Sequence, residues 1–379
     1  MAAGLSIKEL QSFSWSSGGK VAVQLKSLPK GRRVTGLTFW LAGTVANTSG
    51  GTLLVYPQAL AEVLGRVFLE SELFKLRATG RMLTSMYHHA TGRAFMAKPA
   101  TSIATAGSGA VNMFAHVPLS DSRAMSPYDT AIPSELLEDR VIEVDFGDGA
   151  TLGDTAGVTL SAGQLRTYIH TVDGGEGIIP TPSRIDYVDW AGQTAYPLPQ
   201  GACSHLFIYD ESDAALAPVT EYTRFTLEGD GQKLIDNVNV EALVADWNHK
   251  HASGYEIGGV TEVHASATDV PAEQLNPAST PFVPLITPPN QYKLSQLLYA
   301  EENFRVDYSG SNTSARFAYR IVGDRKPEQE LRALSKMGVA EPERAMLAVK
   351  TASKTDLAGP SKRVERLGRL LPKRVEVAR

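Results

Sequence analysis

The strongest constraint on the fold of this chain is a set of four short segments that occurs twice, in the same order. Each half contains a Val-Pro-Leu segment, a Ser-x-Leu-Leu segment, a segment with Val-Asp before an aromatic residue, and an alternating segment with Arg at its second position. The first copies occupy residues 117–119, 134–137, 143–149 and 165–170, and the second copies occupy residues 283–285, 295–298, 305–310 and 315–320. Four matches in one order predict a duplicated domain. Chance similarity between β-strands is the alternative.

The predicted elements between residues 20 and 322 are mostly β-strands. Apolar and polar residues alternate there in short segments, which is the pattern of a strand with one buried face. Turn-forming clusters separate these segments, and the 33 Gly and 21 Pro favour many short strands over long helices. The predicted strands are Val34–Val45, Val111–Leu119, Val141–Phe146, Leu165–Val172, His205–Tyr209, Tyr222–Glu228, Phe304–Tyr308 and Ala315–Val322.

Helical patterns in this region are short. Leu60–Phe68 has apolar residues at helical spacing, although its end, Arg66–Glu70, also fits a strand. Short helices are predicted at Pro133–Asp139 and Lys293–Tyr299. We therefore expect an all-β fold of two tandem jelly-roll β-sandwiches, with short inserted helices and a helical, basic C-terminal tail.

The expected domain boundary is the Gly- and Pro-rich segment Asp173–Ser183, whose composition suits a linker. The predicted division is an N-terminal arm at 1–13, a first jelly roll at 14–175, a linker at 176–181, a second jelly roll at 182–324 and a basic helical tail at 325–379. Each sandwich then has the length of a jelly roll.

The tail differs from the rest of the chain in charge. Residues 325–379 contain 14 Lys or Arg against 7 Asp or Glu, whereas the whole chain has a net charge of −4. The last predicted helix, Ser361–Leu371, combines an apolar stripe with positive charge. We expect a contact with a membrane, nucleic acid or another subunit through Lys362, Arg363, Arg366, Arg369, Lys373 and Arg374. All three interpretations stay open: an amphipathic basic helix suits an anionic membrane, clustered cations neutralise phosphates, and the stripe suits packing on a neighbouring subunit.

Few residues have the spacing of a catalytic or metal site. The single cysteine, Cys203, excludes an internal disulfide and a zinc site built from cysteines. On a strand, adjacent His88 and His89 point to opposite faces, so a surface or loop pair is expected; His249 and His251 share a face on a strand but have no further ligand nearby in sequence. We expect no catalytic residue, no metal and no cofactor.

The acidic clusters and two tryptophans leave narrower alternatives. The clusters are Asp145, Asp148 and Asp154; Asp173 and Glu176; and Asp210, Glu211 and Asp213. The first cluster lies on a Gly-rich loop and offers the oxygen ligands that calcium prefers, but its spacing fits no EF-hand. Solvated loop carboxylates are the default interpretation. Trp190 and Trp247 are candidates for a carbohydrate platform, although a single Trp is more often part of a core.

The N-terminal residues show no charged region followed by an apolar stretch, and no apolar run approaches 18 residues. We therefore expect no signal peptide and no membrane-spanning helix, and the single cysteine suits folding in a cell interior.

Two regions carry a resemblance to a known family. Ala110–Phe146 has a strand ending in Val-Pro-Leu, a loop, a short helix after a Pro and a strand alternating into Asp-Phe. Gly31–Glu70 has a strand, a polar turn, and then a Pro followed by Leu and Val at helical spacing. Both resemble the double jelly-roll major capsid proteins of tailless icosahedral DNA phages, of the tectivirus and corticovirus type.

This resemblance implies a structural protein of the virion rather than an enzyme. It implies a homotrimer whose six jelly rolls form a pseudo-hexagonal capsomer, with neighbouring capsomers and other virion proteins as partners and no small-molecule substrate. An internal membrane or the genome is a further partner that the basic tail offers. The alternatives are a glycan-processing hydrolase of tandem jelly-roll type, a virion spike or carbohydrate-binding module, and a minor coat protein.

Overall fold

The computed structural model describes the chain in segments, and all structural statements below concern these residues. They are 4–48, 63–71, 74–91, 96–98, 103–121, 123–124, 130–147, 158–173, 183–189, 201–210, 222–229, 231–251, 282–288, 291–292, 297–300, 304–310 and 315–323. Residues 176–181 and 325–379, the predicted linker and tail, lie outside them.

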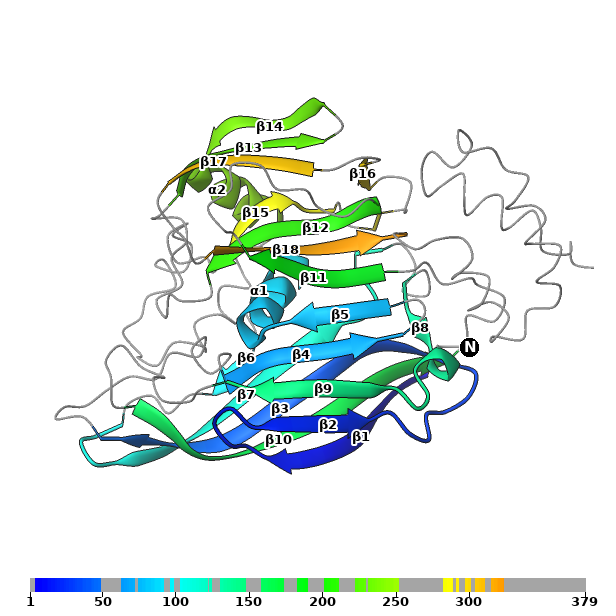
Figure 1. Ribbon diagram of the computed structural model, residues 1–379, viewed down its shortest axis with the longest axis vertical. Coiled ribbons are helices and arrows are strands. Elements are labelled where there is room, and N and C mark those ends of the chain that lie inside the picture. The colour runs from blue at the N-terminus through cyan, green and yellow to red at the C-terminus, as the bar shows by residue number, and fades with distance from the viewer. Residues whose placement is uncertain are drawn as a thin grey trace, which may run out of the picture.

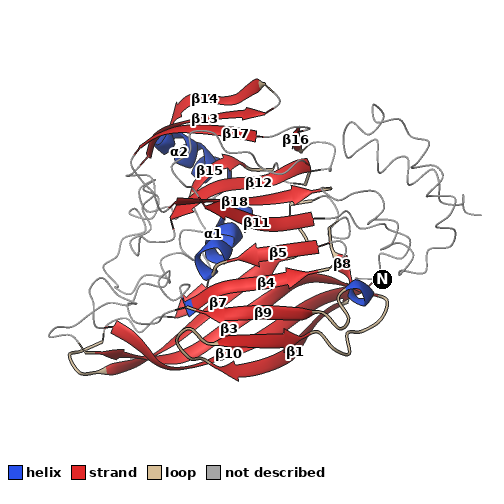
Figure 2. Cartoon of the chain, viewed as in Figure 1, coloured by secondary structure: helices blue, strands red, loops and turns tan. Residues whose placement is uncertain are grey.

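The first half of the chain forms a sandwich of two sheets, and the chain crosses from one sheet to the other several times (Figures 1 and 2). One sheet contains β1 (Leu5–Ser14), β3 (Arg32–Asn47), β6 (Met96–Lys98), β7 (Ser108–Pro118), β8 (Ile132–Pro133) and β10 (Val158–Asp173). The facing sheet contains β2 (Lys20–Gln24), β4 (Leu64–Glu70), β5 (Phe74–Ala78) and β9 (Val141–Phe146). Their orders, β1-β10-β3-β7-β6 and β2-β9-β4-β5, are those of a jelly roll.

The second half repeats this strand order. One sheet has β15 (Val283–Ile286), β12 (Gly201–Asp210), β18 (Ala315–Val322) and β11 (Ser183–Asp189) in that order, with β16 (Leu298–Ala300) beside β12. The facing sheet has the order β14 (Gln232–Asn239), β13 (Tyr222–Gly229) and β17 (Phe304–Gly310). Counting from the start of each half, β11, β12, β15 and β18 hold the places of β1, β3, β7 and β10. The predicted all-β fold of two jelly-roll sandwiches is confirmed.

The repeated sequence segments lie on equivalent strands. Val-Pro-Leu ends β7 in the first sandwich and lies in β15 in the second. The Val-Asp-aromatic segments lie in β9 and β17, and the alternating segments with Arg lie in β10 and β18. The Ser-x-Leu-Leu segment begins with a short 3-10 helix, Ser134–Leu136; much of its second copy lies outside the described residues.

One sheet runs through both sandwiches. β5 of the first sandwich pairs in parallel with β11 of the second, and the register joins Phe74, Lys75 and Leu76 to Ser183, Arg184 and Ile185. Within the described residues this pair makes a nine-stranded sheet, which rises from β2 to β15 in Figure 1. Hydrogen bonds of backbone to backbone therefore fix the two sandwiches to each other.

Alternating side chains build the core. In β3, Leu37, Phe39 and Leu41 are fully buried between the sheets, as the sequence pattern predicts. Burying each such side chain stabilises the fold by about 1.5–3 kcal/mol. A second cluster fills the second sandwich, with Leu206, Ile208, Phe225 and others at its centre.

Two helices occupy equivalent positions and were not predicted. α1 (Gly80–Thr91) follows β5, and α2 (Val240–His251) follows β14. The Thr79 hydroxyl accepts a hydrogen bond from the Met82 backbone N–H, and the Asn239 side chain does the same for Glu241, so each helix has an N-terminal cap. α1 has apolar residues at helical spacing, Met82, Met86 and Ala90 among them, and this signal could have revealed it. The fold also buries polar residues of this helix, such as Arg81 and His89.

Other expectations need correction. Residues 5–13, assigned to an arm, form most of β1, because their alternating residues pair with β10 along the strand. The helix predicted at Leu60–Phe68 is wrong from Leu64 on, where β4 begins; its alternative as a strand is correct. The helix predicted at Lys293–Tyr299 is wrong at its end, because Leu298 and Tyr299 belong to β16. No helix among the described residues is both long and apolar enough to cross a membrane.

Candidate functional site: the junction between the two sandwiches

The sheet β11-β18-β12 is buried on both faces. On one face Leu206, Ile208 and Phe317 belong to the core of the second sandwich. On the other face Phe207 and Tyr209 join the core of the first sandwich, where Leu76 and Ile185 also lie. The outer face of the second sandwich is thus the wall on which the first sandwich packs.

An ion-pair cluster flanks the parallel strand pair. The Asp186 carboxylate is 1% exposed and forms ion pairs with two arginines. Arg77 comes from the first sandwich, and Arg184 lies on the same strand as Asp186, with 2.7 Å between its Nη2 and Asp186 Oδ2. Arg77 also donates to the Tyr187 carbonyl, at 2.6 Å, and lies over the Tyr187 ring. Burial opposes the charge of Arg77, but the hydrogen bond and the charge of Asp186 outweigh it and raise its pKa.

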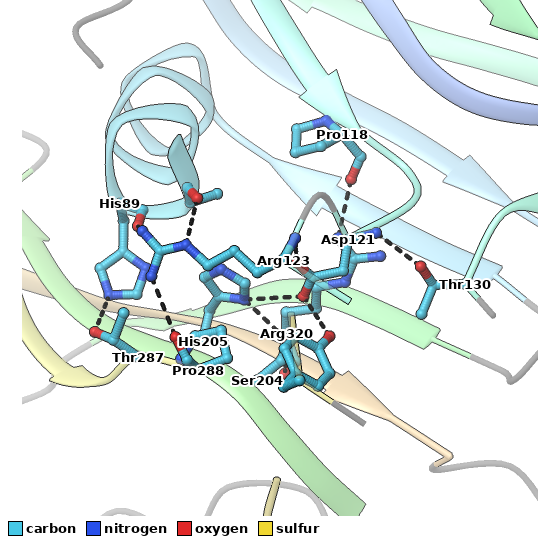
Figure 3. Close-up of polar contacts among 12 residues, drawn as sticks. His89, Pro118, Asp121, Arg123, Thr130, Ser204, His205, Thr287, Pro288 and Arg320 are labelled. Carbon is cyan, nitrogen blue, oxygen red and sulfur yellow. Dashed lines mark hydrogen bonds and ion pairs between the residues drawn. The ribbon is translucent and has the colours of Figure 1, made fainter. Parts of the chain in front are cut away.

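A buried arginine links the end of β7 to β18 (Figure 3). Arg320 is 1% exposed and donates to the carbonyls of Pro118, at 3.1 Å, and Leu119, at 2.6 Å. The two carbonyls belong to the first sandwich and the guanidinium to the second, so these hydrogen bonds cross the junction. The guanidinium and both carbonyls are buried. Removing the guanidinium would therefore take away a hydrogen-bond donor from two carbonyls that water cannot reach, which costs free energy of folding.

Asp121 is the buried carboxylate near Arg320. Its carboxylate accepts a hydrogen bond from the Tyr292 hydroxyl at 2.7 Å, and His205 Nδ1 lies 3.5 Å away. Its backbone N–H donates to the Thr130 hydroxyl. Burial alone would raise the pKa of Asp121, but His205, Arg320 and the hydrogen bonds from Tyr292 and from a backbone N–H outweigh it, so the pKa is lowered. The carboxylate is therefore kept charged inside the protein.

Arg123 ties the end of α1 to the second sandwich. It donates to the carbonyls of Ala90, at 2.6 Å, and His89, at 2.9 Å, which lie in the last turn of α1, and to that of Pro288, at 3.3 Å. A cation at a helix C-terminus satisfies carbonyls that have no partner within the helix. Burial lowers the pKa of Arg123 to about 10, against the opposing effect of Asp121 and Tyr292.

Aromatic rings surround the two histidines of α1. His88 contacts the rings of Trp247 and Phe282 edge-on, with centroids 5.3 and 5.4 Å apart. His89 is fully buried against Phe207, and its Nε2 lies 3.1 Å from the Thr287 hydroxyl. Burial lowers the pKa of His88 to about 4, so its ring is neutral near pH 7.

The polar groups of the junction bind to one another across the two sandwiches and are not arranged as a catalytic site. Its carboxylates, Asp121 and Asp186, are each about 1% exposed and are surrounded by cations and hydroxyl donors. No group of His, Cys, Asp and Glu among the described residues is arranged to hold a metal ion. What the arrangement achieves is one fixed orientation of the two sandwiches.

The sequence-based site expectations have mixed outcomes. The basic residues Lys362, Arg363, Arg366, Arg369, Lys373 and Arg374 lie outside the described residues, as do Asp148, Asp154, Glu176, Glu211, Asp213 and Trp190. Asp145 pairs with Arg66 at 2.9 Å, and Asp173 pairs with Arg32. Trp247 is a core residue.

The histidine expectations were wrong in their structural context. His88 and His89 are not a surface pair, because they lie on α1 beneath the aromatic cluster. His249 and His251 lie on the helix α2 and not on a strand, the element for which a shared face was considered. Cys203 is fully buried, and burial raises the pKa of its thiol.

We expect Arg320→Met to lower the free energy of unfolding by about 2–5 kcal/mol, because two buried carbonyls lose their donor and Asp121 loses a neighbouring cation. Arg305→Met is the matched control, since Arg305 pairs with Asp307 on an exposed part of β17 and should cost about 1 kcal/mol or less. Chemical denaturation of both variants measures the difference. Equal losses would contradict a role of Arg320 in the junction.

The histidine of the aromatic cluster predicts a pH dependence. The pKa of His88 is about 4 in the folded chain, below its ordinary value of 6.5, so between these values the unfolded chain binds a proton that the folded chain does not. Stability from the neutral ring is therefore lost as the pH falls from 6.5 towards 4. We expect His88→Gln to reduce the difference in unfolding free energy between pH 7 and pH 5 by on the order of 1 kcal/mol. Urea titrations at the two pH values check this, and an unchanged difference would contradict it.

Comparison with known proteins finds similarity in structure but not in sequence. No protein-family model matches the chain, and no curated protein sequence does. The crystal structure of the major capsid protein of Sulfolobus turreted icosahedral virus matches with a TM-score of 0.53 at 13% identity, over 84% of this chain and 96% of that one. A chain in the atomic structure of the same virus matches with a TM-score of 0.57 at 15% identity, over 90% and 99%.

The major capsid protein P2 of bacteriophage PM2 also matches, with a TM-score of 0.47 at 12% identity, over 85% of this chain and 98% of that one. The fold assignment rests on the two Sulfolobus virus structures, which the match covers almost from end to end. The resemblance indicated by the sequence is confirmed at the level of the fold: this chain has the double jelly-roll fold of the major capsid proteins of icosahedral viruses.

Proposed function

We propose that this chain is a major capsid protein and that three copies form a capsomer in which six sandwiches make a pseudo-hexagonal tile. The observation that carries the proposal is the junction, which joins two equivalent sandwiches in one fixed head-to-tail arrangement. The matched structures with the same fold are capsid components, which are structural proteins and not enzymes.

The geometry of the junction favours a closed ring. The second sandwich presents one sheet to the first, while its other sheet, β14-β13-β17, faces away from it. Such a head-to-tail contact between similar bodies is heterologous, and repeating it produces a ring when the rotation closes. Three chains then supply six similar lobes, which is the number that a hexagonal net requires.

The proposal places the protein in the virion, after folding in the host cytoplasm, with neighbouring capsomers and other virion proteins as partners. An assignment to a bacteriophage follows only from the sequence resemblance. The basic tail is proposed to lie inside the shell or to clamp neighbours, through Lys362, Arg363, Arg366, Arg369, Lys373 and Arg374. A membrane, the genome and a neighbouring subunit are the surfaces that its charge and apolar stripe fit.

The geometry does not favour the hydrolase alternative. A glycan hydrolase of this kind needs two accessible carboxylates in a groove between the domains. The described carboxylates at the junction, Asp121 and Asp186, are buried and bound to Arg, His or Tyr side chains. A substrate has no access to either group without separating the two sandwiches.

Native mass spectrometry of the purified full chain tests the proposal. We expect a species of three times the chain mass of 40.8 kDa, and electron microscopy of concentrated protein should show hexagonal particles or sheets of them. A chain that stays monomeric at all concentrations and ionic strengths, with no higher assembly, would contradict the proposed function.

Deleting residues 362–379 tests the tail. We expect the truncated protein to keep its trimer and thermal unfolding temperature but to lose capsid assembly or binding to anionic vesicles, since these residues add charge and an apolar stripe outside the sandwiches. Light scattering and vesicle co-sedimentation measure the two losses. A truncated chain that unfolds would instead place the tail in the core.

A further inference from the structure

Two of the open sheet edges in the described part of the molecule lie at its opposite ends. β1 is the outermost strand of its sheet and pairs with β10 only, and β14 is the outermost strand of its sheet and pairs with β13 only. They lie at the bottom and the top of Figure 1. Large apolar side chains remain exposed on both strands: Leu5 at 65%, Ile7 at 57% and Leu234 at 38%. Open edges with apolar side chains are sites of strand pairing between chains.

These two edges are the counterparts of the two edges that pair inside the chain. β1 and β11 are each the first strand of a sandwich and pair antiparallel with its last strand, β10 or β18. β5 and β14 are each the second strand of a hairpin and lead into a helix, α1 or α2. Inside the chain β5 pairs in parallel with β11. The equivalent pair is β14 with β1, and because these strands lie at opposite ends of one molecule, it requires two copies.

The sheet faces beside these edges differ in the same way. Tyr209, opposite Arg316, is buried where the second sandwich meets the first. Its equivalent in the first sandwich is Trp40, opposite Arg166, because Arg166 and Arg316 hold the same place in the repeated segment. Trp40 is only partly buried and stacks on Phe114, which is 36% exposed, with ring centroids 5.5 Å apart. The face that is covered by a sandwich in one half thus carries exposed aromatic rings in the other.

We propose that β14 of one copy pairs in parallel with β1 of the next copy, so that the first sheet of each chain is covered by the second sandwich of its neighbour. This inference rests on the proposed trimer and identifies its contact. Around a closed ring of three chains, every such edge is paired and every aromatic face is covered. The contact between chains then repeats the contact within each chain, which is the condition for six equivalent lobes.

Two independent alignments give the register of this pair. Within the chain, Leu76 lies opposite Ile185 in the parallel pair. Val144 and Val306 hold the same place in the repeated segment and face Val67 and Leu227, so Leu69 and Gly229, two residues further on, are equivalent. Leu69 faces Leu76 in its hairpin and Gly229 faces Gln232, so Gln232 takes the place of Leu76.

For the other strand, Ile185 faces Arg320, and Ile7 faces His170. Arg320 and His170 hold the same place in the repeated segment, so Ile7 takes the place of Ile185. The predicted neighbours across the contact are therefore Gln232 of one copy and Ile7 of the next.

Cysteine cross-linking in the full chain tests the register. Aligned residues of paired strands have Cα atoms close enough for a disulfide. We expect Ile7→Cys combined with Gln232→Cys, after mild oxidation with copper–phenanthroline, to give covalent dimers and trimers on a non-reducing denaturing gel. Ser6→Cys combined with Gln232→Cys is the matched control, because adjacent residues of a strand point to opposite faces, and it should remain uncross-linked. Cys203 is buried and does not compete.

Charge substitutions test the contact without a disulfide. Ile7→Asp should raise the concentration at which the trimer dissociates at least tenfold and leave the fold of the monomer intact, because Ile7 is exposed in a single chain. Val141→Asp, at an apolar residue on β9 that is 38% exposed, is the control and should leave the trimer unchanged.

The outcomes separate the two proposals. Trimers that form normally but neither cross-link through Ile7 and Gln232 nor respond to Ile7→Asp would overturn the strand pairing and leave the proposed function standing. An unsubstituted chain that forms no trimer under any condition would overturn both.

Discussion

The parallel pairing of β5 with β11 is the interaction on which the rest of the architecture depends. It converts two sandwiches into one body, because it continues a single sheet across the boundary. Once the sheet continues, the outer face of β11, β18 and β12 has to be buried, and Phe207 and Tyr209 fill the core of the first sandwich. A loosely tethered pair of domains would have left this face in water, where its aromatic rings would be a liability.

The polar groups at this junction contribute orientation more than net stability. Bringing Arg320, Asp121 and Arg123 out of water costs several kcal/mol for each ion, and their mutual hydrogen bonds offset that cost only in one geometry. The apolar contacts of Phe207 and Tyr209 tolerate small rotations, whereas hydrogen bonds to named carbonyls do not. In the proposed capsomer, an error in the angle between two lobes would be multiplied around the ring.

The sequence predicts the sandwiches well and the junction poorly. Period-two alternation identifies strands such as β3 and β9, and the repeated segments place equivalent strands in both halves. It misses α1, although Met82, Met86 and Ala90 lie at helical spacing, because polar residues that the fold buries, such as Arg81 and His89, stand among them. It also misses Arg320 and Asp121, since the repeat aligns Arg320 with His170 and nothing local distinguishes a buried charge from a solvated one. These charges are buried against each other only after β5 pairs with β11, and this pair joins residues more than a hundred positions apart.

The same long-range pair sets an order for synthesis. All strands of the first sandwich lie within the first 173 residues, so this sandwich has its complete set of strands before β11 is translated. Until then the edge of β5 stays open and the core that later receives Phe207 and Tyr209 lacks its cover. A chain emerging from the ribosome therefore passes through an interval in which a half-built protein exposes a strand edge meant for its own second half. Several chains translated from one message would bring such edges close together. Slow translation of residues 183–210 would therefore prolong the exposure of the β5 edge and favour aggregation of incomplete chains.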